Sequence, residues 1–269
     1  MYCLACANQK GGQGKTTTAI NLAGALAEVG EKVLLVDLDP QHSVAAYYHV
    51  TPNAKANLYH GLIAGNDDAL PPLIQPGPDG FDLLLGSEDL LAAERQLGQV
   101  QNRVWQFILK EKLRAVSDLY DWVILDCPPS LGPLFVSALA AADGVLIPVA
   151  ADFLSYAGLT LLVQTIGEIR KGLNPELQVV GVLINAYETR LTDNHEIQRI
   201  IRGDRYPDFA VLDTVIPKSV VVSRASITGR CLQKLAQEPG ASSSQKRLAD
   251  LYEQLSKEVR SRVLSTAAA

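Results

Sequence analysis

Two lysines in one short glycine-rich segment carry the most evident chemistry of this sequence. Residues 7–23 read ANQKGGQGKTTTAINLA, with an apolar run before the glycines and a helical pattern after them. Glycines allow a tight turn whose backbone N–H groups converge on phosphate oxygens. Lys15 supplies a cation for terminal phosphates, and the Thr16 hydroxyl is a ligand that Mg²⁺ accepts. The segment predicts a phosphate-binding loop that opens a helix.

Lys10 is the second lysine, and it directly precedes the glycines. The general pattern GxxxxGK[ST] would place a glycine at position 9, which is Gln9 here, whereas the shorter form KGGxGKT is intact. A phosphate loop of the general kind has no role for a lysine at position 10. Lys10 is therefore either a solvated loop residue or a group with a ligand of its own.

Aspartates end two of the apolar runs. VLLVDLDPQ gives Asp37 and Asp39, and WVILDCPPS gives Asp126. In a sheet of parallel strands these positions lie at the carboxyl edge, where ligands bind. Asp126 fits the carboxylate that holds Mg²⁺, directly or through water. The alternative for each aspartate is to cap the helix that follows.

Apolar runs alternate with helical patterns along the whole sequence. This alternation predicts an α/β fold with a single doubly wound, mostly parallel β-sheet and helices on both faces, the P-loop NTPase fold, over residues 1–269 as one domain. The helix after the loop should end near Gly30, and Ser242 with Gln245 should cap a terminal helix. Strands are expected at residues 2–8, 32–38, 81–86, 121–126, 144–149, 178–185 and 210–217.

Composition and charge narrow the function classes. The 269 residues are 48% hydrophobic and 20% charged, with a net charge of −5, so any nucleic-acid binding must come from a local basic patch. Cys3 and Cys6 lie three apart in the first expected strand, on opposite faces, which favours buried thiols over a metal site. No signal peptide is visible, the apolar runs are too mixed to span a bilayer, and we expect a cytoplasmic protein.

KGGxGKT, DLDPQ and the segments PVAADF, NAYETR and VIPKSVVVSRA together carry a family resemblance. The sequence resembles the deviant P-loop ATPases of the ParA/MinD type, most closely the ParA/Soj partition ATPases. The resemblance implies a homodimer that sandwiches ATP and Mg²⁺ and hydrolyses ATP slowly until a partner stimulates it. It also implies that Lys10 reaches the nucleotide of the other subunit, while Lys15 binds its own. No helix-turn-helix extension is expected before the loop.

The resemblance assigns the remaining site residues. In this family Asp39 would orient or deprotonate the attacking water, and Thr16, Asp37 and Asp126 would hold or support Mg²⁺. The catalytic residues would be Lys10, Lys15 and Asp39. The ATP-binding set is Lys10, Gly11, Gly12, Gln13, Gly14, Lys15, Thr16, Thr17, the strand-end Asn185 for the base and the backbone near Pro217. Asn185 as a simple turn former is the alternative.

What the dimer holds is the open question. ParA-type relatives bind chromosomal DNA non-specifically and act with a ParB-like partner, which implies a nucleoid-associated protein that partitions a plasmid or chromosome. The matching basic positions are Arg190, Lys218, Arg224 and Arg230. Alternatives are a protein compartment or cluster as cargo, or a MinD-like membrane-associated regulator. The terminal helix lacks Phe and Trp on its apolar face, which argues against membrane binding.

Overall fold

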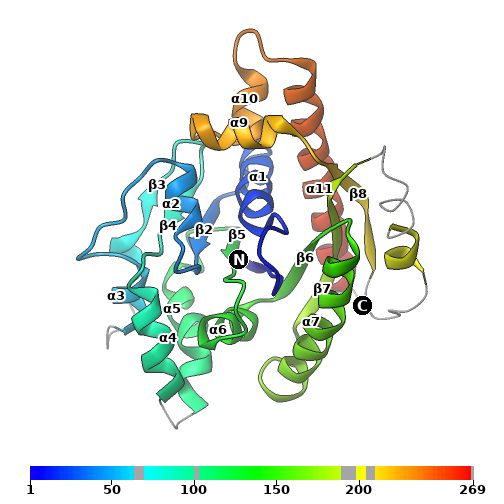
Figure 1. Ribbon diagram of the computed structural model, residues 1–269. Coiled ribbons are helices and arrows are strands. Elements are labelled where there is room, and N and C mark those ends of the chain that lie inside the picture. The colour runs from blue at the N-terminus through cyan, green and yellow to red at the C-terminus, as the bar shows by residue number, and fades with distance from the viewer. Residues whose placement is uncertain (64–69, 100–102, 189–197, 204–209, 268–269) are drawn as a thin grey trace.

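The computed structural model describes residues 1–63, 70–99, 103–188, 198–203 and 210–267 (Figure 1). Within these residues one sheet has eight strands in the order β3-β4-β2-β5-β1-β6-β7-β8, and all neighbours run parallel except β3 and β4. The seven predicted strands are confirmed, and β3 is an addition. The strands are β1 (Tyr2–Cys6), β2 (Val33–Asp37), β3 (Gln75–Pro76), β4 (Asp82–Leu84), β5 (Trp122–Asp126), β6 (Gly144–Ala150), β7 (Gln178–Tyr187) and β8 (Val211–Pro217).

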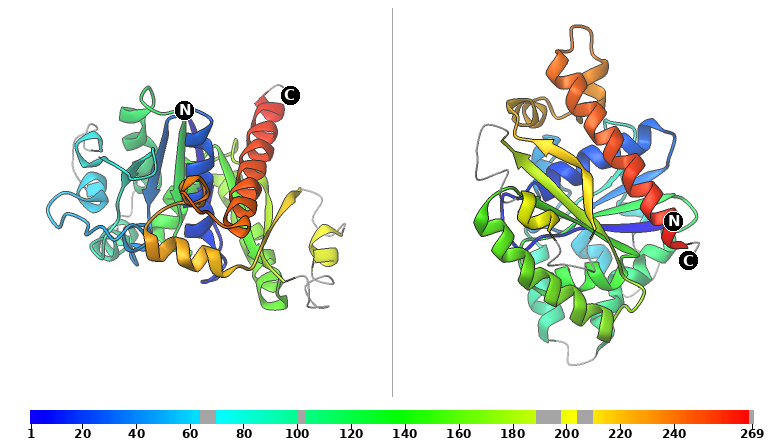
Figure 2. Two further views of the ribbon diagram at one scale, coloured as in Figure 1. Left: turned by 90° about the horizontal axis from the view of Figure 1, so that it is seen from above. Right: turned by 90° about the vertical axis from the view of Figure 1, so that its right-hand side faces the viewer.

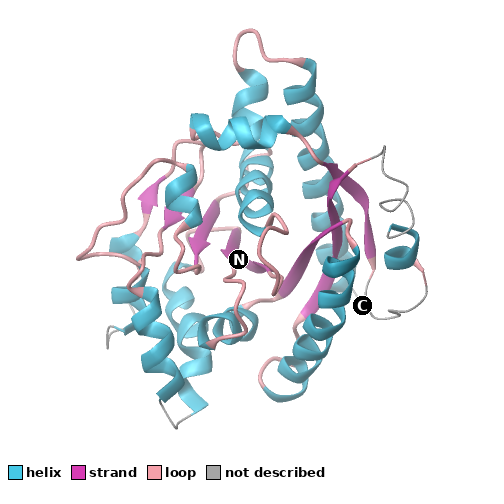
Figure 3. Ribbon diagram, viewed as in Figure 1, coloured by secondary structure: helices cyan, strands magenta, loops and turns pink. Residues whose placement is uncertain are grey.

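Helices cover both faces of the sheet, so that the strands lie between two helical layers (Figure 3). One buried apolar cluster packs α3 to α7 on one face, and a second packs α1, α2, α9, α10 and α11 on the other. The predicted doubly wound fold is therefore confirmed. The helices are α1 (Lys15–Glu28), α2 (Ser43–Tyr47), α3 (Leu58–Ile63), α4 (Leu90–Gln99), α5 (Ile108–Leu113), α6 (Pro133–Ala141), α7 (Phe153–Gly172), α9 (Val220–Thr228), α10 (Leu232–Gln237) and α11 (Ser243–Ala267).

Side chains of the first strand point alternately to the two faces of the sheet. Cys3 belongs to the cluster under α3–α7, whereas Cys6 belongs to the cluster under α1 and α11. Both thiols are buried and free, and burial raises their pKa well above the ordinary value. The prediction of two separate buried thiols is confirmed, because side chains three apart on a strand point to opposite faces.

The ends of α1 and α11 also follow the sequence. Gly30 has φ 88°, a left-handed conformation that ends the segment after α1 at little steric cost. Before α11, the Ser242 backbone N–H donates to Gln245 Oε1 at 2.7 Å, and the Gln245 N–H donates back to Ser242 Oγ at 3.3 Å. The predicted capping box is confirmed.

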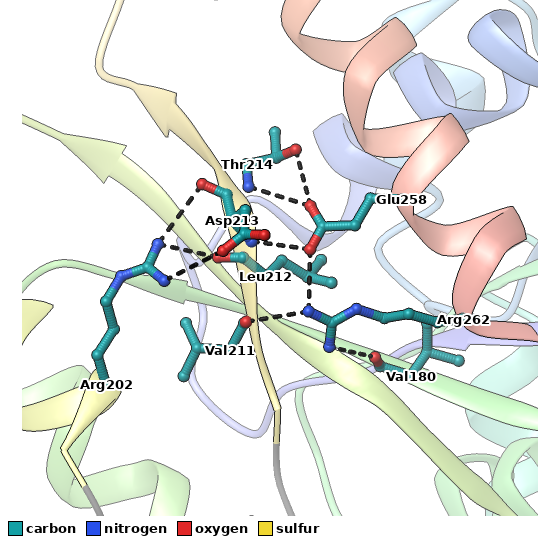
Figure 4. Close-up of polar contacts among 8 residues, drawn as sticks. All are labelled: Val180, Arg202, Val211, Leu212, Asp213, Thr214, Glu258 and Arg262. Atoms are coloured by element: carbon teal, nitrogen blue, oxygen red, sulfur yellow. Dashed lines mark hydrogen bonds and ion pairs between the residues drawn. The ribbon is translucent and has the colours of Figure 1, made fainter. Parts of the chain in front are cut away.

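Helix α11 lies alongside β8, the last strand of the sheet (Figures 1 and 2). Figure 4 shows Glu258 of α11 accepting hydrogen bonds from the Asp213 N–H at 2.8 Å, the Thr214 N–H at 3.0 Å and the Thr214 hydroxyl at 2.9 Å. Arg262 donates to the carbonyls of Val180 at 3.2 Å and Val211 at 3.1 Å. The contacts to Val211, Asp213 and Thr214 satisfy backbone groups of the edge strand β8 that would otherwise be open to pairing with another chain.

We expect Glu258→Gln to lower the free energy of unfolding by about 2 kcal/mol, because an amide N–H₂ would face backbone donors that now meet a carboxylate. Burial alone would raise the pKa of Glu258, but the three hydrogen bonds and Arg262 hold this pKa below the ordinary 4.5. The carboxylate therefore stabilises the fold above pH 4.5, and its contribution is lost as pH falls through the lowered pKa. Urea unfolding at pH 7 and pH 3 measures this. Glu253→Gln, on the exposed side of α11, is the matched control.

Candidate nucleotide-binding site

The glycine-rich loop joins β1 to α1 at the carboxyl edge of the sheet. Gly12 and Gly14 have φ 75° and 79°, which only glycine adopts without strain. A Cβ at Gly14 would lie 2.1 Å from Asn185 Nδ2, so this position also needs glycine for the close approach of β7. The loop is therefore shaped by its glycines in the way the sequence predicts.

Side chains from the loop fasten it to β6 and β7. Asn8 Nδ2 donates to the Pro148 carbonyl at 2.7 Å, and the buried Gln13 side chain accepts from the Ala150 N–H at 2.8 Å. Asn185 Nδ2 donates to the Gln13 carbonyl at 3.0 Å. The loop backbone is thus held at both ends before any ligand binds. Sequence reasoning gave Gln13 only a ligand role and missed this contact, which no local pattern encodes.

Two adjoining cavities open above the loop. The larger, of about 640 Å³, is lined by the loop and the first turn of α1, by Asp39, Gln41, Ser43, Ala46 and Tyr47 after β2, and by Pro129 and Ser226. The smaller, of about 140 Å³, lies between the loop and the ends of β7 and β8, and it includes Thr17, Asn185 and Pro217. The structure therefore brings the predicted phosphate, water and base residues around one continuous region.

The two lysines of the loop have different surroundings. Lys15 is buried, with 7% of its surface exposed, and its Nζ lies 3.5 Å from the Lys10 carbonyl oxygen. The Lys10 ammonium lies 3.1 Å from Asp152 Oδ1 and 3.1 Å from Ser155 Oγ, both in the same chain. Lys15 thus lines the cavity of its own chain, whereas Lys10 is held by the start of α7.

Asp37 and Asp39 organise the turn after β2. The Asp37 carboxylate accepts the Asp39 N–H at 3.1 Å through one oxygen and the Val44 N–H at 3.0 Å through the other. Asp39 is 8% exposed and accepts the Gln41 N–H at 2.9 Å. Asp37 therefore fixes the start of α2 and supports the turn, and Asp39 is the carboxylate that lines the cavity.

Asp126 ends β5 directly beside Asp37 in the sheet and is fully buried. Neither of its carboxylate oxygens has a hydrogen-bond partner among the described residues. Burial raises the pKa of Asp126 to about 7, while the Thr16 hydroxyl and the Lys15 ammonium act in the opposite sense. Burial and the charge of Asp126 raise the pKa of Asp37 as well. A buried carboxylate beside a threonine hydroxyl and a lysine ammonium fits a site for hydrated Mg²⁺.

Comparison with known proteins shows which family the chain belongs to. Residues 1–179 match the family described as AAA domain. The chain is 40% identical over 264 residues to the chromosome-partitioning ATPase Soj of Thermus thermophilus, which covers 97% of this chain and 96% of the relative. It is 38% identical over 232 residues to the chromosome partitioning protein ParA of Caulobacter vibrioides, with 84% of each covered. This chain belongs to the ParA/Soj family of partitioning ATPases.

Solved structures with the same fold hold nucleotide. Cobyrinic acid a,c-diamide synthase from Mycobacterium smegmatis, with bound ADP and magnesium, has a TM-score of 0.75 at 33% identity, over 85% of this chain and 91% of that one. A complex of McdA from Cyanothece with ATP has a TM-score of 0.83 at 22% identity, over 96% of both. At that identity the McdA likeness supports the fold alone.

The turn that carries Asp39 in this ParA/Soj chain is also tied to α9 and α10. At the end of α2, Tyr47 donates its hydroxyl proton to the Arg230 carbonyl at 2.9 Å, and Tyr48 donates to the buried Asp79 carboxylate at 2.9 Å. His49 Nε2 lies 3.1 Å from the Ile227 carbonyl oxygen. These contacts between distant segments were not predicted, because nothing near Tyr47 in the sequence points to residue 230.

The basic residues predicted to contact DNA differ in exposure and in the polar contacts that their side chains make. Arg190 lies outside the described residues. Lys218 pairs with Glu188 at 2.8 Å, and Arg230 donates to the Pro78 carbonyl at 2.7 Å. Arg224 is exposed on α9. Their role in DNA binding stays a prediction, and the contacts of Arg230 also give it a role in holding the α9–α10 junction.

Proposed function

We propose that this ParA/Soj chain is a Mg²⁺-dependent ATPase that forms an ATP-sandwich homodimer and binds DNA non-specifically. With a ParB-like partner that stimulates hydrolysis, it would segregate a plasmid or chromosome on the nucleoid. The observation that carries the proposal is the meeting of the glycine-rich loop and Asp39 around one cavity, with the buried Asp126 at the end of the strand beside Asp37. The Soj and ParA relatives support the partitioning role.

Each residue has a physical task in this proposal. Lys15 and the backbone N–H groups of the loop bind the phosphates, and Asp39 orients the attacking water and accepts its proton. Thr16 and Asp126 would hold Mg²⁺, with Asp37 supporting them, and the bound ion neutralises charge on the terminal phosphates. Lys10 adds a cation to the neighbour's nucleotide, so phosphate release removes the attraction between subunits.

The membrane-associated alternative is less well supported. The apolar face of α11 packs on the sheet, with Leu248, Tyr252, Leu255 and Val259 buried in the core. A helix that lies on a membrane needs such a face to be free. Among the described residues, no helix has the length and apolar content needed to cross a bilayer.

DNA binding with and without ATP tests the proposal, using the wild type, Lys10→Ala and Asp39→Ala at two salt concentrations. We expect Lys10→Ala to abolish ATP-dependent DNA binding. Asp39→Ala should retain binding and lose turnover by about 100-fold or more, the scale of a lost general base. Affinity should fall steeply with salt, because the contacts are to phosphates. Equal DNA affinity of the wild type with and without ATP would contradict the switch.

A further inference from the structure

Lys10, which is proposed to bind the nucleotide of a second subunit, has polar partners within its own chain. Its Nζ contacts Asp152 Oδ1 and Ser155 Oγ, each at 3.1 Å, at the first turn of α7. Asp152 is also the N-cap of α7, where its carboxylate accepts the Ser155 N–H at 2.9 Å and the Ser155 hydroxyl at 2.5 Å. One carboxylate thus serves both as a helix cap and as the counter-ion of Lys10.

We infer that Asp152 is an internal competitor for Lys10, which restrains dimer formation in the nucleotide-free protomer. The inference rests on the proposed function, in which Lys10 binds the triphosphate of a second subunit. For the dimer to form, the ammonium must exchange the Asp152 carboxylate for phosphate oxygens. Asp152 therefore acts through Lys10, as a positioning residue.

The ion pair between Lys10 and Asp152 can break at little energetic cost. The side chains of Lys10 and Asp152 are 36% and 48% exposed, and ion pairs this exposed to water are weak. When Lys10 leaves, the carboxylate keeps both hydrogen bonds from Ser155, so no charge is left without donors. The competition is strong enough to bias the equilibrium and too weak to prevent binding to a triphosphate.

The loop backbone need not move for this exchange. The Lys10 N–H donates to Asn8 Oδ1 at 3.0 Å, and Asn8 and Gln13 hold the loop to β6. Rotation of the long Lys10 side chain is then the only change required at this position. A triphosphate carries more negative charge than one carboxylate, which sets the direction of the exchange.

Asp152→Asn tests the inference, because asparagine is as good an N-cap as aspartate and carries no charge. With a non-hydrolysable ATP analogue and Mg²⁺, we expect the dimer dissociation constant of this variant to fall about 2- to 5-fold at low salt, the scale of one exposed ion pair. The gain should shrink at high salt. Asp118→Asn, at an exposed carboxylate away from the loop, should change nothing. Sedimentation velocity measures the constant, and thermal unfolding checks that the cap is kept.

A second readout examines the nucleotide-free protomer and does not depend on dimerisation. Acylation of lysines followed by mass spectrometry gives the reactivity of Lys10 relative to the exposed Lys55. We expect Asp152→Asn to raise this ratio at least about 2-fold, and Ser155→Ala to raise it less. An unchanged reactivity ratio would show that Lys10 does not pair with Asp152 in solution. A raised ratio without a lower dimer dissociation constant would show that the pair does not restrain dimer formation. A wild type that stays monomeric with the analogue would instead refute the proposed function.

Discussion

Asparagine in place of Asp126 is expected to stabilise the nucleotide-free protein at pH 8 while lowering Mg²⁺-dependent ATP hydrolysis by about 100-fold or more. The two effects have opposite signs because the same carboxylate is costly without a cation and necessary with one. Asp126 is fully buried beside Asp37, and its oxygens lack hydrogen-bond partners among the described residues. Asparagine keeps the shape of the side chain and removes the charge.

The sign of the pH dependence follows from the raised pKa. Burial raises the pKa of Asp126 from 3.8 to about 7, so the folded state binds the proton more tightly than the unfolded chain does. The free energy of unfolding should therefore fall as pH rises from 4 to 7, and the full cost is present above pH 7. Between pH 5 and pH 8 the wild type should lose on the order of 2 kcal/mol from the buried pair of Asp126 and Asp37, and Asp126→Asn should lose less, because only Asp37 then titrates.

Denaturant unfolding at pH 5 and pH 8, without nucleotide and with Mg²⁺ and ATP, measures both effects. Mg²⁺ and ATP should stabilise the wild type at pH 8 much more than they stabilise Asp126→Asn, since the ion needs the carboxylate. The control is Asp250→Asn, an exposed carboxylate on α11. The same pH dependence in Asp126→Asn and the wild type would show that another group is responsible.

The sheet was predictable because its strands are nearly continuous apolar runs, the pattern of parallel strands covered on both faces. Strand β3 was missed because it is two residues long, contains Pro76 and pairs antiparallel at the edge, so it has no apolar run. The capping box before α11 was predictable for a different reason. Ser242 and Gln245 are three residues apart, and this spacing alone predicts the contact.

The site was predictable in its parts and less so in how they are held. The loop, Asp39 and Asp126 follow from strand ends and glycine spacing. In contrast, the Asn185 amide donates to the Gln13 carbonyl and its oxygen accepts the Ala186 N–H, so both polar ends already have partners. Base recognition by Asn185 stays a prediction, and its contact with the loop depends on two residues that are 172 positions apart.

The pairing of Lys10 with Asp152 was hidden for the same reason, since 142 positions separate the two residues. The charge of Lys10 could be read from the sequence, but its resting partner could not. The contact competes with the predicted role in the dimer but does not prevent it, because an exposed ion pair exchanges readily. In the nucleotide-free protomer Lys10 therefore pairs with Asp152, whereas Lys15 lies at the phosphate loop.

Lys15→Ala should lower the affinity of the protomer for ATP by about 100- to 1,000-fold, whereas Lys10→Ala should leave this affinity within about 3-fold of the wild type. Lys15 is buried at the phosphate loop, where solvent ions screen its attraction to phosphate only weakly, so its loss removes a strong contact. The Lys10 ammonium instead contacts Asp152 and Ser155 at the start of α7. Titration with a fluorescent ATP analogue, at protein concentrations below dimer formation, separates the two lysines. A loss of affinity in Lys10→Ala as large as that in Lys15→Ala would mean that both cations serve one nucleotide, and the sandwich would then have no residue to hold it together.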